Sequence, residues 1–256
     1  MKWLASVCLA LCVFHATAQF NFSDPAFVAP RAAAGGTTAP TPDIYWNKFT
    51  DGSGTTATAT TGPNLTHDAD WITGKSGSDY ALDFNGTSDD GATASAITYS
   101  TNKITVCGWF WWDTVTSTRV LFESSANYND NGDTFLIYTD VVSSTNSLQA
   151  AVRGASTKIR REGIATPATG AWRHLAFVLD HSTTAGDVKI FLDGAEQTTL
   201  IHANTKDTST NFTAQTLNVF ARNRASLWSD GRLDDLRVYS GELTAEQITA
   251  VKDDPQ

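Results

Sequence analysis

Asp234 carries a charge in a segment that the sequence predicts to be a packed strand. It alternates with Leu236 and Val238, and alternate residues of a β-strand share one face of the sheet. If that face packs against the core, the carboxylate needs a partner, because burying an unpaired charge is costly. A bound cation would satisfy it, and so would Arg237 or backbone N–H groups. The sequence leaves these three partners open.

Aromatic side chains are a second group with functional potential, because the face of a tryptophan ring stacks well on a sugar ring. In the run Ile104–Trp112, Trp109 and Trp111 share one strand face, whereas Phe110 and Trp112 share the other. Two further aromatic residues lie in polar segments that favour loops. We predict four ligand contacts: Trp111, Trp112, Tyr128 and Trp228. For each of them the alternative is packing in the core or at a sheet edge.

The sequence does not predict a catalytic centre. Glycoside cleavage needs two carboxylates at a set separation, and the adjacent Asp234 and Asp235 are expected to point to opposite faces of a strand. His174 lies in a strand-like run and is interpreted as a core histidine. The sequence contains no G-x-S-x-G nucleophile motif. We therefore expect a protein that is not an enzyme and has no catalytic residues.

Short strands separated by turns must position these side chains. Asn-Gly and Asp-Gly pairs mark the turns at Asn85-Gly86, Asn131-Gly132, Asp193-Gly194 and Asp230-Gly231. The β-branched and aromatic runs between polar segments predict seven strands, at 104–112, 134–139, 148–153, 172–179, 188–192, 217–221 and 232–239. This pattern is typical of an all-β sandwich or jelly roll.

One short helix is predicted at the C-terminus. Thr244 and Gln247 form a capping box, and Leu243 and Ile248 are spaced as a hydrophobic staple. The helix should run from about Ala245 to Val251 and pack on the edge of the sandwich.

The first residues have the features of an export signal. Lys2 precedes an apolar run, and Ala16-Thr17-Ala18 forms an A-x-A cleavage site, so we predict a signal peptide at residues 1–18. Residues 19–42 are rich in Pro, Ala and Gly and are expected to form a disordered leader or linker. The folded domain is expected to span residues 43–256.

Charge and cysteine content limit the partners and the cross-links. The chain has a net charge of −9, and cleavage after Ala18 removes one lysine and no acidic residue, which makes it −10. This charge argues against nucleic acid and against anionic membranes as partners. Cys8 and Cys12 would leave with the signal, so Cys107 would have no intrachain disulfide partner.

Seven segments also follow one another in a familiar order: Phe49–Gly54, Gly74–Gly86, Ile104–Trp109, Trp172–Ala176, Val188–Gly194, Gly231–Tyr239 and Leu243–Ile248. Together they resemble the laminin-G-like jelly-roll domain of the concanavalin A-like lectin/glucanase superfamily, over residues 43–253. The resemblance implies a two-sheet antiparallel jelly-roll sandwich with one short C-terminal helix. It does not fix the function, because domains of one fold serve many purposes.

Relatives of this kind often hold one structural Ca²⁺ between the opening loop and the strand that begins near Asp234. The resemblance therefore implies Asp51 and Asp234 as metal ligands, since hard cations take carboxylate and carbonyl oxygens. The commonest opening loop has Asp directly after the aromatic residue, whereas this chain has Thr50 there and Asp51 one place later. The alternative for Asp234 is a hydrogen-bonded carboxylate at a strand end.

Taken together, we expect a secreted or cell-surface, lectin-like module that binds extracellular glycan and is stabilised by a structural calcium ion. The alternative is an extracellular module that binds a surface protein or has a structural role, without a sugar site. A polysaccharide-degrading enzyme is disfavoured, because the paired carboxylates of glucanases in this group are missing from the sequence. No membrane insertion is expected after signal cleavage.

Overall fold

The structure is a computed structural model that describes residues 36–87, 91–115, 117–125, 132–140, 147–154 and 158–255. The predicted signal peptide and most of the predicted leader lie outside these residues. Residues 37–256 form one compact unit, in which Pro42 is buried and Ala39 packs against the cluster around the C-terminal helix. The folded unit therefore begins before Asp43. No helix in the described part of the chain has the length and apolarity that a membrane span requires.

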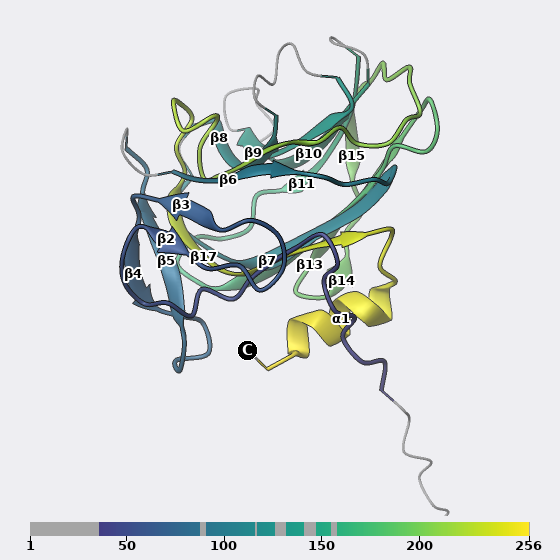
Figure 1. The fold of residues 1–256 in the computed structure, drawn as a ribbon. Helices are drawn as coiled ribbons and strands as arrows, with labels where there is room; N and C mark the ends of the chain where they lie inside the picture. Colours follow the sequence, from purple (N-terminus) through teal and green to yellow (C-terminus); the bar gives the residue numbers. More distant parts are fainter. Residues whose placement is uncertain are drawn as a thin grey trace, which may run out of the picture. The chain divides into compact units, whose positions relative to one another are not determined.

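Two antiparallel sheets form the sandwich, as predicted (Figure 1). Seven strands of the eight-stranded sheet follow one another in space: β14 (Ala195–Glu196), β13 (Asp187–Leu192), β12 (Arg173–Asp180), β7 (Lys103–Thr114), β17 (Asp230–Ser240), β5 (Tyr80–Asn85) and β4 (Asp70–Thr73). The eighth, β1 (Tyr45–Asn47), pairs with the later part of β17.

The nine-stranded sheet forms the second layer. Its spatial order is β15 (Leu200–Asn204), β11 (Ile159–Ala165), β10 (Ser147–Arg153), β9 (Thr134–Asp140), β8 (Arg119–Ser124), β16 (Gln215–Val219), β6 (Ala92–Ile97), β3 (Leu65–His67) and β2 (Thr56–Ala57). All seven predicted strands are present, with shifted ends.

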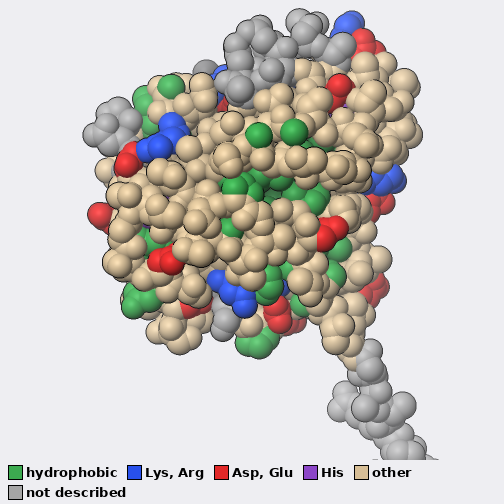
Figure 2. Space-filling model, in the orientation of Figure 1, with side chains coloured by type: hydrophobic (Ala, Val, Ile, Leu, Met, Phe, Trp, Pro, Cys, Tyr) green, Lys and Arg blue, Asp and Glu red, His purple; other side chains and the backbone are tan. Residues whose placement is uncertain are grey.

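The main core lies between the two sheets. Alternate residues of β7, including Val106, Phe110 and Trp112, pack in one core with Phe122 of β8 and with Phe220, which directly follows β16. In the view of Figure 2, hydrophobic side chains gather near the centre, whereas charged side chains are scattered around them. Burial of these large aromatic side chains stabilises the sandwich, and Cys107 forms no disulfide.

The helix α1 (Ala245–Asp253) packs on the outer face of the eight-stranded sheet (Figure 1). Thr244 and Gln247 form the predicted capping box. Ile248 and Val251 are buried in a second apolar cluster with Cys107, Ala176, Val178, Phe191 and Tyr239. Trp109 and Trp111 lie on the same sheet face outside this cluster and are half-buried.

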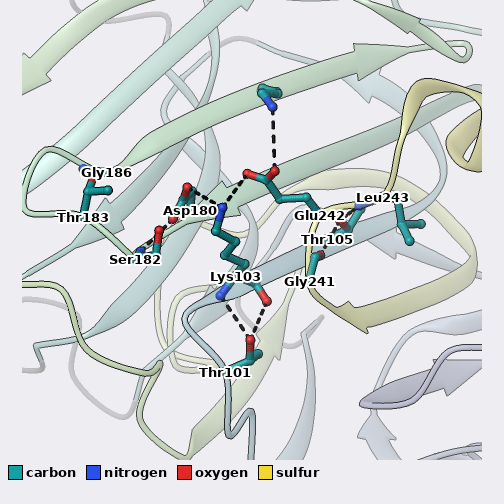
Figure 3. Close-up of polar contacts among 11 residues, drawn as sticks. Thr101, Lys103, Thr105, Asp180, Ser182, Thr183, Gly186, Gly241, Glu242 and Leu243 are labelled. Carbon is teal, nitrogen blue, oxygen red and sulfur yellow. Dashed lines mark hydrogen bonds and ion pairs between the residues drawn. The ribbon is translucent and has the colours of Figure 1, made fainter.

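Polar contacts tie the segment before α1 to β7 (Figure 3). The Lys103 ammonium lies 3.0 Å from Asp180 and 3.5 Å from Glu242. Thr105 donates to the Gly241 carbonyl and accepts from the Leu243 amide. These contacts fix where the helix begins.

Two of the predicted turns can be compared directly. Asp193 and Gly194 both have positive φ, at 52° and 87°, and join β13 to β14 in a hairpin, as predicted. The predicted turn at Asp230-Gly231 is wrong, because both residues lie inside β17. Gly231 is needed for a different reason: a Cβ there would collide with the Trp111 carbonyl oxygen of the neighbouring strand β7.

Candidate functional site

The outer face of the eight-stranded sheet presents three tryptophan side chains and several charges. We call Trp109, Trp111, Trp172, Arg232, Asp83 and Asp113 the tryptophan face. Trp109 and Trp111 point outward from β7, because Phe110 and Trp112 between and beyond them point into the core. Arg232 of β17 stands opposite Trp111 and Asp83 of β5. Three neighbouring strands therefore bring these side chains together.

Trp111 lies at the centre of the tryptophan face. Its ring centroid is 6.1 Å from that of Trp172 at an interplanar angle of 71°, and the Arg232 guanidinium lies 4.8 Å above its ring. The indole N–H donates to Asp113 at 2.9 Å. Trp111 is half-buried, and these contacts hold its ring in one orientation.

Charges of both signs border this ring. Arg232 donates to Asp83 at 3.3 Å and lies 3.9 Å from Asp113. Partial burial raises the pKa of Asp83, and the nearby Arg232 charge partly offsets that effect. The tryptophan face therefore combines apolar ring surface with hydrogen-bond donors and acceptors that are held by one another.

A cluster of oxygen atoms lies next to the tryptophan face, around Gly74. A Cβ at Gly74 would collide with Asp79 Oδ1 and lie 2.8 Å from Asp234 Oδ2 and 2.9 Å from the Tyr80 carbonyl oxygen. We call Asp79, Asp234 and the Tyr80 carbonyl the oxygen cluster. Only a glycine allows three oxygens to approach the chain so closely here.

Each carboxylate of the oxygen cluster is only half satisfied. Asp234 Oδ2 accepts from the Lys75 amide at 2.8 Å, and Asp79 Oδ1 accepts from the Ser76 hydroxyl at 2.5 Å. Asp234 Oδ1 and Asp79 Oδ2 are buried and have no hydrogen-bond partner among the described residues. Burial raises the pKa of Asp234 to about 7, and the charges of Asp79 and Asp235 add to the effect.

This donor set fits a hard cation. Ca²⁺ binds carboxylate and main-chain carbonyl oxygens, usually six to eight of them with water included, and each of these two carboxylates has one oxygen without a described partner. Within the described ranges, no group of three or more His, Cys, Asp and Glu side chains converges on one point. The oxygen cluster would therefore supply only part of a coordination sphere.

The placement of Asp234 differs from the expectation. Asp234 does not share a face with Leu236 and Val238, because β17 bulges between Asp234 and Arg237 and Asp235 takes a positive φ of 48°. Leu236 and Val238 enter the core, whereas Asp234 stands opposite Trp109 on the outer face. Of the three partners left open, the backbone N–H of Lys75 is the one that the structure shows.

The same bulge places Asp235 on the side that Arg237 occupies. Asp235 accepts from Arg237 Nε at 2.7 and 2.9 Å and from the Trp46 indole at 2.8 Å. The expectation that Asp234 and Asp235 point to opposite faces is therefore wrong. Asp235 is nevertheless fully engaged in a buried ion pair, which suits a structural role.

Asp51 is not brought to Asp234. It is exposed in the opening loop, and its Oδ2 accepts from the Thr58 amide at 2.7 Å. Asp79, which follows the segment Gly74–Gly77 and precedes β5, is a carboxylate that lies near Asp234. The glycine-rich turn followed by an aspartate was visible in the sequence, but only the strand pairing shows that it meets β17.

The other predicted contacts have different outcomes. Trp112 is 1 % exposed and stacks against Phe110 in the core, so its prediction as a ligand contact is wrong. Tyr128 lies outside the described residues. Trp228 is half-buried in the connection from β16 to β17, and none of the ring contacts among the described residues joins it to Trp111. Trp172 and Arg232 were not predicted as site residues.

Two buried titratable groups outside the tryptophan face have structural surroundings. Burial lowers the pKa of His174 to about 3, so its imidazole is neutral, and it packs edge-on against Trp109 at 5.3 Å. Glu123 is buried in β8, where it accepts from Ser125 at 2.6 Å and from Arg222 at 3.3 Å. Burial raises the pKa of Glu123, and these partners oppose the rise.

Comparison with known proteins finds the fold of this sandwich in several solved structures. Domain 4 of an extracellular GH43 arabinanase from Geobacillus stearothermophilus, solved with arabinotriose, has a TM-score of 0.52 at 22% identity, covering 83% of this chain and 87% of that one. The botulinum neurotoxin serotype D ligand-binding domain, solved with N-acetylneuraminic acid, has a TM-score of 0.59 at 13% identity and 83% coverage of this chain.

A third similar structure is the Trypanosoma rangeli sialidase in complex with an inhibitor, with a TM-score of 0.56 at 11% identity and 84% coverage of this chain. The matches cover 50% of the neurotoxin domain's chain and 33% of the sialidase chain. A comparison with curated proteins gave no significant match.

These likenesses show a shared fold, and the sequence itself gives the family. The profile of the concanavalin A-like lectin/glucanases superfamily matches residues 84–249, which include β7, β12, β17 and the start of α1. Every residue of the tryptophan face except Asp83 lies within this range. The chain therefore belongs to the concanavalin A-like lectin/glucanases superfamily, in its laminin-G-like branch.

Proposed function

We propose that this protein is a non-catalytic, lectin-like module that binds glycan outside the cell through its tryptophan face. The observation that carries the proposal is Trp111, whose ring is fixed by Trp172, Arg232 and Asp113 on the sheet face outside the α1 cluster. A sugar ring presents an apolar face to an indole and hydroxyl groups to neighbouring charged side chains, so the tryptophan face offers both kinds of contact.

The structural relatives support this choice of ligand class. The arabinanase domain was solved with arabinotriose and the neurotoxin domain with N-acetylneuraminic acid. Their identities to this chain are low, so they support saccharide as a class and leave the particular sugar open.

We include a structural calcium ion in the proposal. Asp79 and Asp234 would hold it with the Tyr80 carbonyl, and the ion would neutralise two carboxylates that lack partners for one oxygen each. Lys75 links this cluster to the tryptophan face, because its amide binds Asp234 and its ammonium lies 3.9 Å above the Trp109 ring. Calcium would therefore fix the turn that borders the sugar surface.

Secretion is supported by the sequence of residues 1–18, with its lysine, apolar run and A-x-A site. Absence of catalysis is supported by the missing paired carboxylates in the sequence and by the engagement of Asp235 with Arg237.

One observation favours a protein-binding module as the second candidate. Leu200 and Ile201 of the edge strand β15 are 68% and 58% exposed. An exposed apolar edge strand is suited to pairing with another chain. Saturable capture of a protein by the isolated module, abolished by L200K/I201K and untouched by W111A, would support this second candidate.

A glycan array with the mature protein, probed with and without EDTA, tests the leading proposal. We expect binding to a defined set of saccharides and weaker binding after chelation. If no saccharide is bound at millimolar concentrations in the presence of calcium, the lectin-like function is wrong.

A further inference from the structure

The outer face of the nine-stranded sheet contains an arginine without an acidic partner. Arg161 of β11 lies on the same face as Ala151 of β10, opposite to the core-facing Ala150. Its neighbours Arg160 and Glu162 pair with each other at 2.6 Å. Arg161 itself has no ion pair with any described carboxylate, although the chain carries 27 acidic residues and 18 basic ones.

The environment of Arg161 makes this lack of a partner significant. The side chain is half-buried, and its Nε is buried with no hydrogen-bond acceptor among the described residues. A guanidinium that loses water and gains no acceptor is unfavourable, since a buried donor without a partner costs its full desolvation free energy. The missing group is an acceptor, and an anion would serve best.

A chain of hydrogen bonds starts at Arg161 and points away from it. Arg161 Nη1 donates to the Tyr138 hydroxyl at 3.0 Å, Tyr138 donates to Gln149 Oε1 at 2.8 Å, and Gln149 Nε2 donates to Ser147 at 2.5 Å. Tyr138 and Gln149 are buried. These links orient the guanidinium without neutralising it, so its remaining N–H groups keep their direction.

His202 supplies a second unpartnered polar atom over the same strand, β11. The pairing of β11 with β15 shifts between Arg161 and Glu162, and this bulge leaves His202 between the paired residues Ile201 and Ala203. The His202 Nε2 atom lies 3.1 Å from where a Cβ of Gly163 would be, and it too is buried without a described partner. Gly163 thus allows the imidazole to lie directly over β11, two residues from Arg161.

We propose that Arg161 and His202 form an anion-recognition site for an acidic saccharide, on the sheet opposite to the tryptophan face. The planar guanidinium suits a carboxylate or a sulfate ester, both of which present paired oxygens to its N–H groups. The saccharide part of this proposal rests on the proposed glycan-binding function, whereas recognition of the anion rests on Arg161 and His202 alone.

Isothermal titration of the full mature chain with three matched ligands tests this site: an oligogalacturonate, its methyl ester, and a sulfated neutral oligosaccharide of the same length. We expect the acid to bind and its uncharged ester to bind at least about tenfold more weakly, as charge-assisted hydrogen bonds predict. The sulfated arm shows whether the anion is a sulfate ester rather than a carboxylate.

Arg161→Gln should remove the preference for the charged ligand and leave the affinity for the ester unchanged. Arg161→Lys keeps the charge but loses the planar fork and should weaken binding less than the Gln variant does. Arg173→Gln is the control, because it removes a half-buried arginine of the other sheet that pairs with Asp193. Thermal melts identify any variant that fails to fold, and His202→Gln then provides the second test, with the same loss of preference expected.

Equal binding of all three ligands, or a preference for the acid that survives both Arg161→Gln and His202→Gln, would overturn this site while leaving the glycan-binding function intact. If the preference for the acid depends on Arg161 but binding is unchanged in Trp111→Ala, the result would support the anion site and contradict sugar binding by the tryptophan face. Absence of binding to all three ligands would overturn the site, and a positive glycan array would then show that the proposed function still stands.

Discussion

At the scale of single residues, the most informative atoms are those left without partners. Asp234 Oδ1 and Asp79 Oδ2 are buried next to each other's carboxylates and lack described hydrogen-bond donors. Asp234 was expected from the sequence, but Asp51 was expected beside it and Asp79 was not. The sequence did not predict contact between Gly74–Gly77 and β17. That contact depends on how β4, β5 and β17 pair.

Asp79→Asn and Asp234→Asn should each reduce the stabilisation of the protein by calcium. A ligand that binds only the folded state raises the melting temperature, so the wild type should melt higher in millimolar Ca²⁺ than in EDTA. Each variant should lose most of this difference in differential scanning calorimetry.

Asp51→Asn is the matched control, since it removes an exposed carboxylate of the opening loop. It should keep the full calcium shift. A calcium shift that disappears in Asp51→Asn and persists in Asp79→Asn would show that the opening loop, and not the oxygen cluster, binds the ion.

His174 should make the protein sensitive to acid. Burial lowers its pKa to about 3 from an ordinary value of 6.5, so the folded state stays neutral where the unfolded state takes up a proton. The stabilising contribution is complete above pH 6.5 and is lost as the pH falls toward the folded-state pKa, at up to about 1.4 kcal/mol per pH unit. Urea unfolding at pH 7 and pH 5 measures this loss.

His174→Gln removes the titrating group and should give a smaller fall in unfolding free energy between pH 7 and pH 5 than the wild type. His202→Gln, at a half-buried position, serves as the comparison for removal of a histidine. The same fall in wild type and His174→Gln would contradict a role for His174. His67 and His181, whose pKa values are also lowered by burial, should account for part of the remaining sensitivity.

At the scale of elements, the strand positions follow from the sequence and the irregularities do not. Runs of β-branched and aromatic residues predicted β7, β12 and β13, and each of these strands packs one face against the main core. The bulge in β17 and the in-strand position of Gly231 could not be predicted, since both are set by pairing with β7 across more than 100 residues. One bulge changed the face of Asp234 and with it the candidate site.

Gly231→Ala should destabilise the protein by roughly 2–4 kcal/mol, because the new methyl group would collide with the Trp111 carbonyl in a central strand. Gly170→Ala is the control, since Gly170 also has a positive φ, of 79°, but has open space around its Cβ position. It should cost about 1 kcal/mol. Chemical unfolding that gives equal losses for the two variants would refute the close approach of β17 to β7.

At the scale of the whole molecule, the outer faces of the two sheets differ. The face of the eight-stranded sheet holds α1 and the tryptophan face, whereas the nine-stranded sheet holds Arg161 and His202. The helix α1 and its apolar cluster cover part of the eight-stranded sheet, and the half-buried tryptophans of the tryptophan face lie outside that cluster. The run Ile104–Trp112 showed which aromatic residues share a face, but not which face meets the core. That assignment depends on the second sheet, so Trp112 was mistaken for a ligand contact while Trp172 and Arg232 were missed.

The central claim is that the protein binds saccharide through the tryptophan face. Its most direct test is isothermal titration of the tightest-binding neutral oligosaccharide with wild type, Trp111→Ala and Trp228→Ala. Truncation of a central aromatic contact should weaken binding on the order of tenfold or more, whereas Trp228→Ala should keep the wild-type affinity. Unchanged affinity in a folded Trp111→Ala protein, or a loss confined to Trp228→Ala, would contradict the claim.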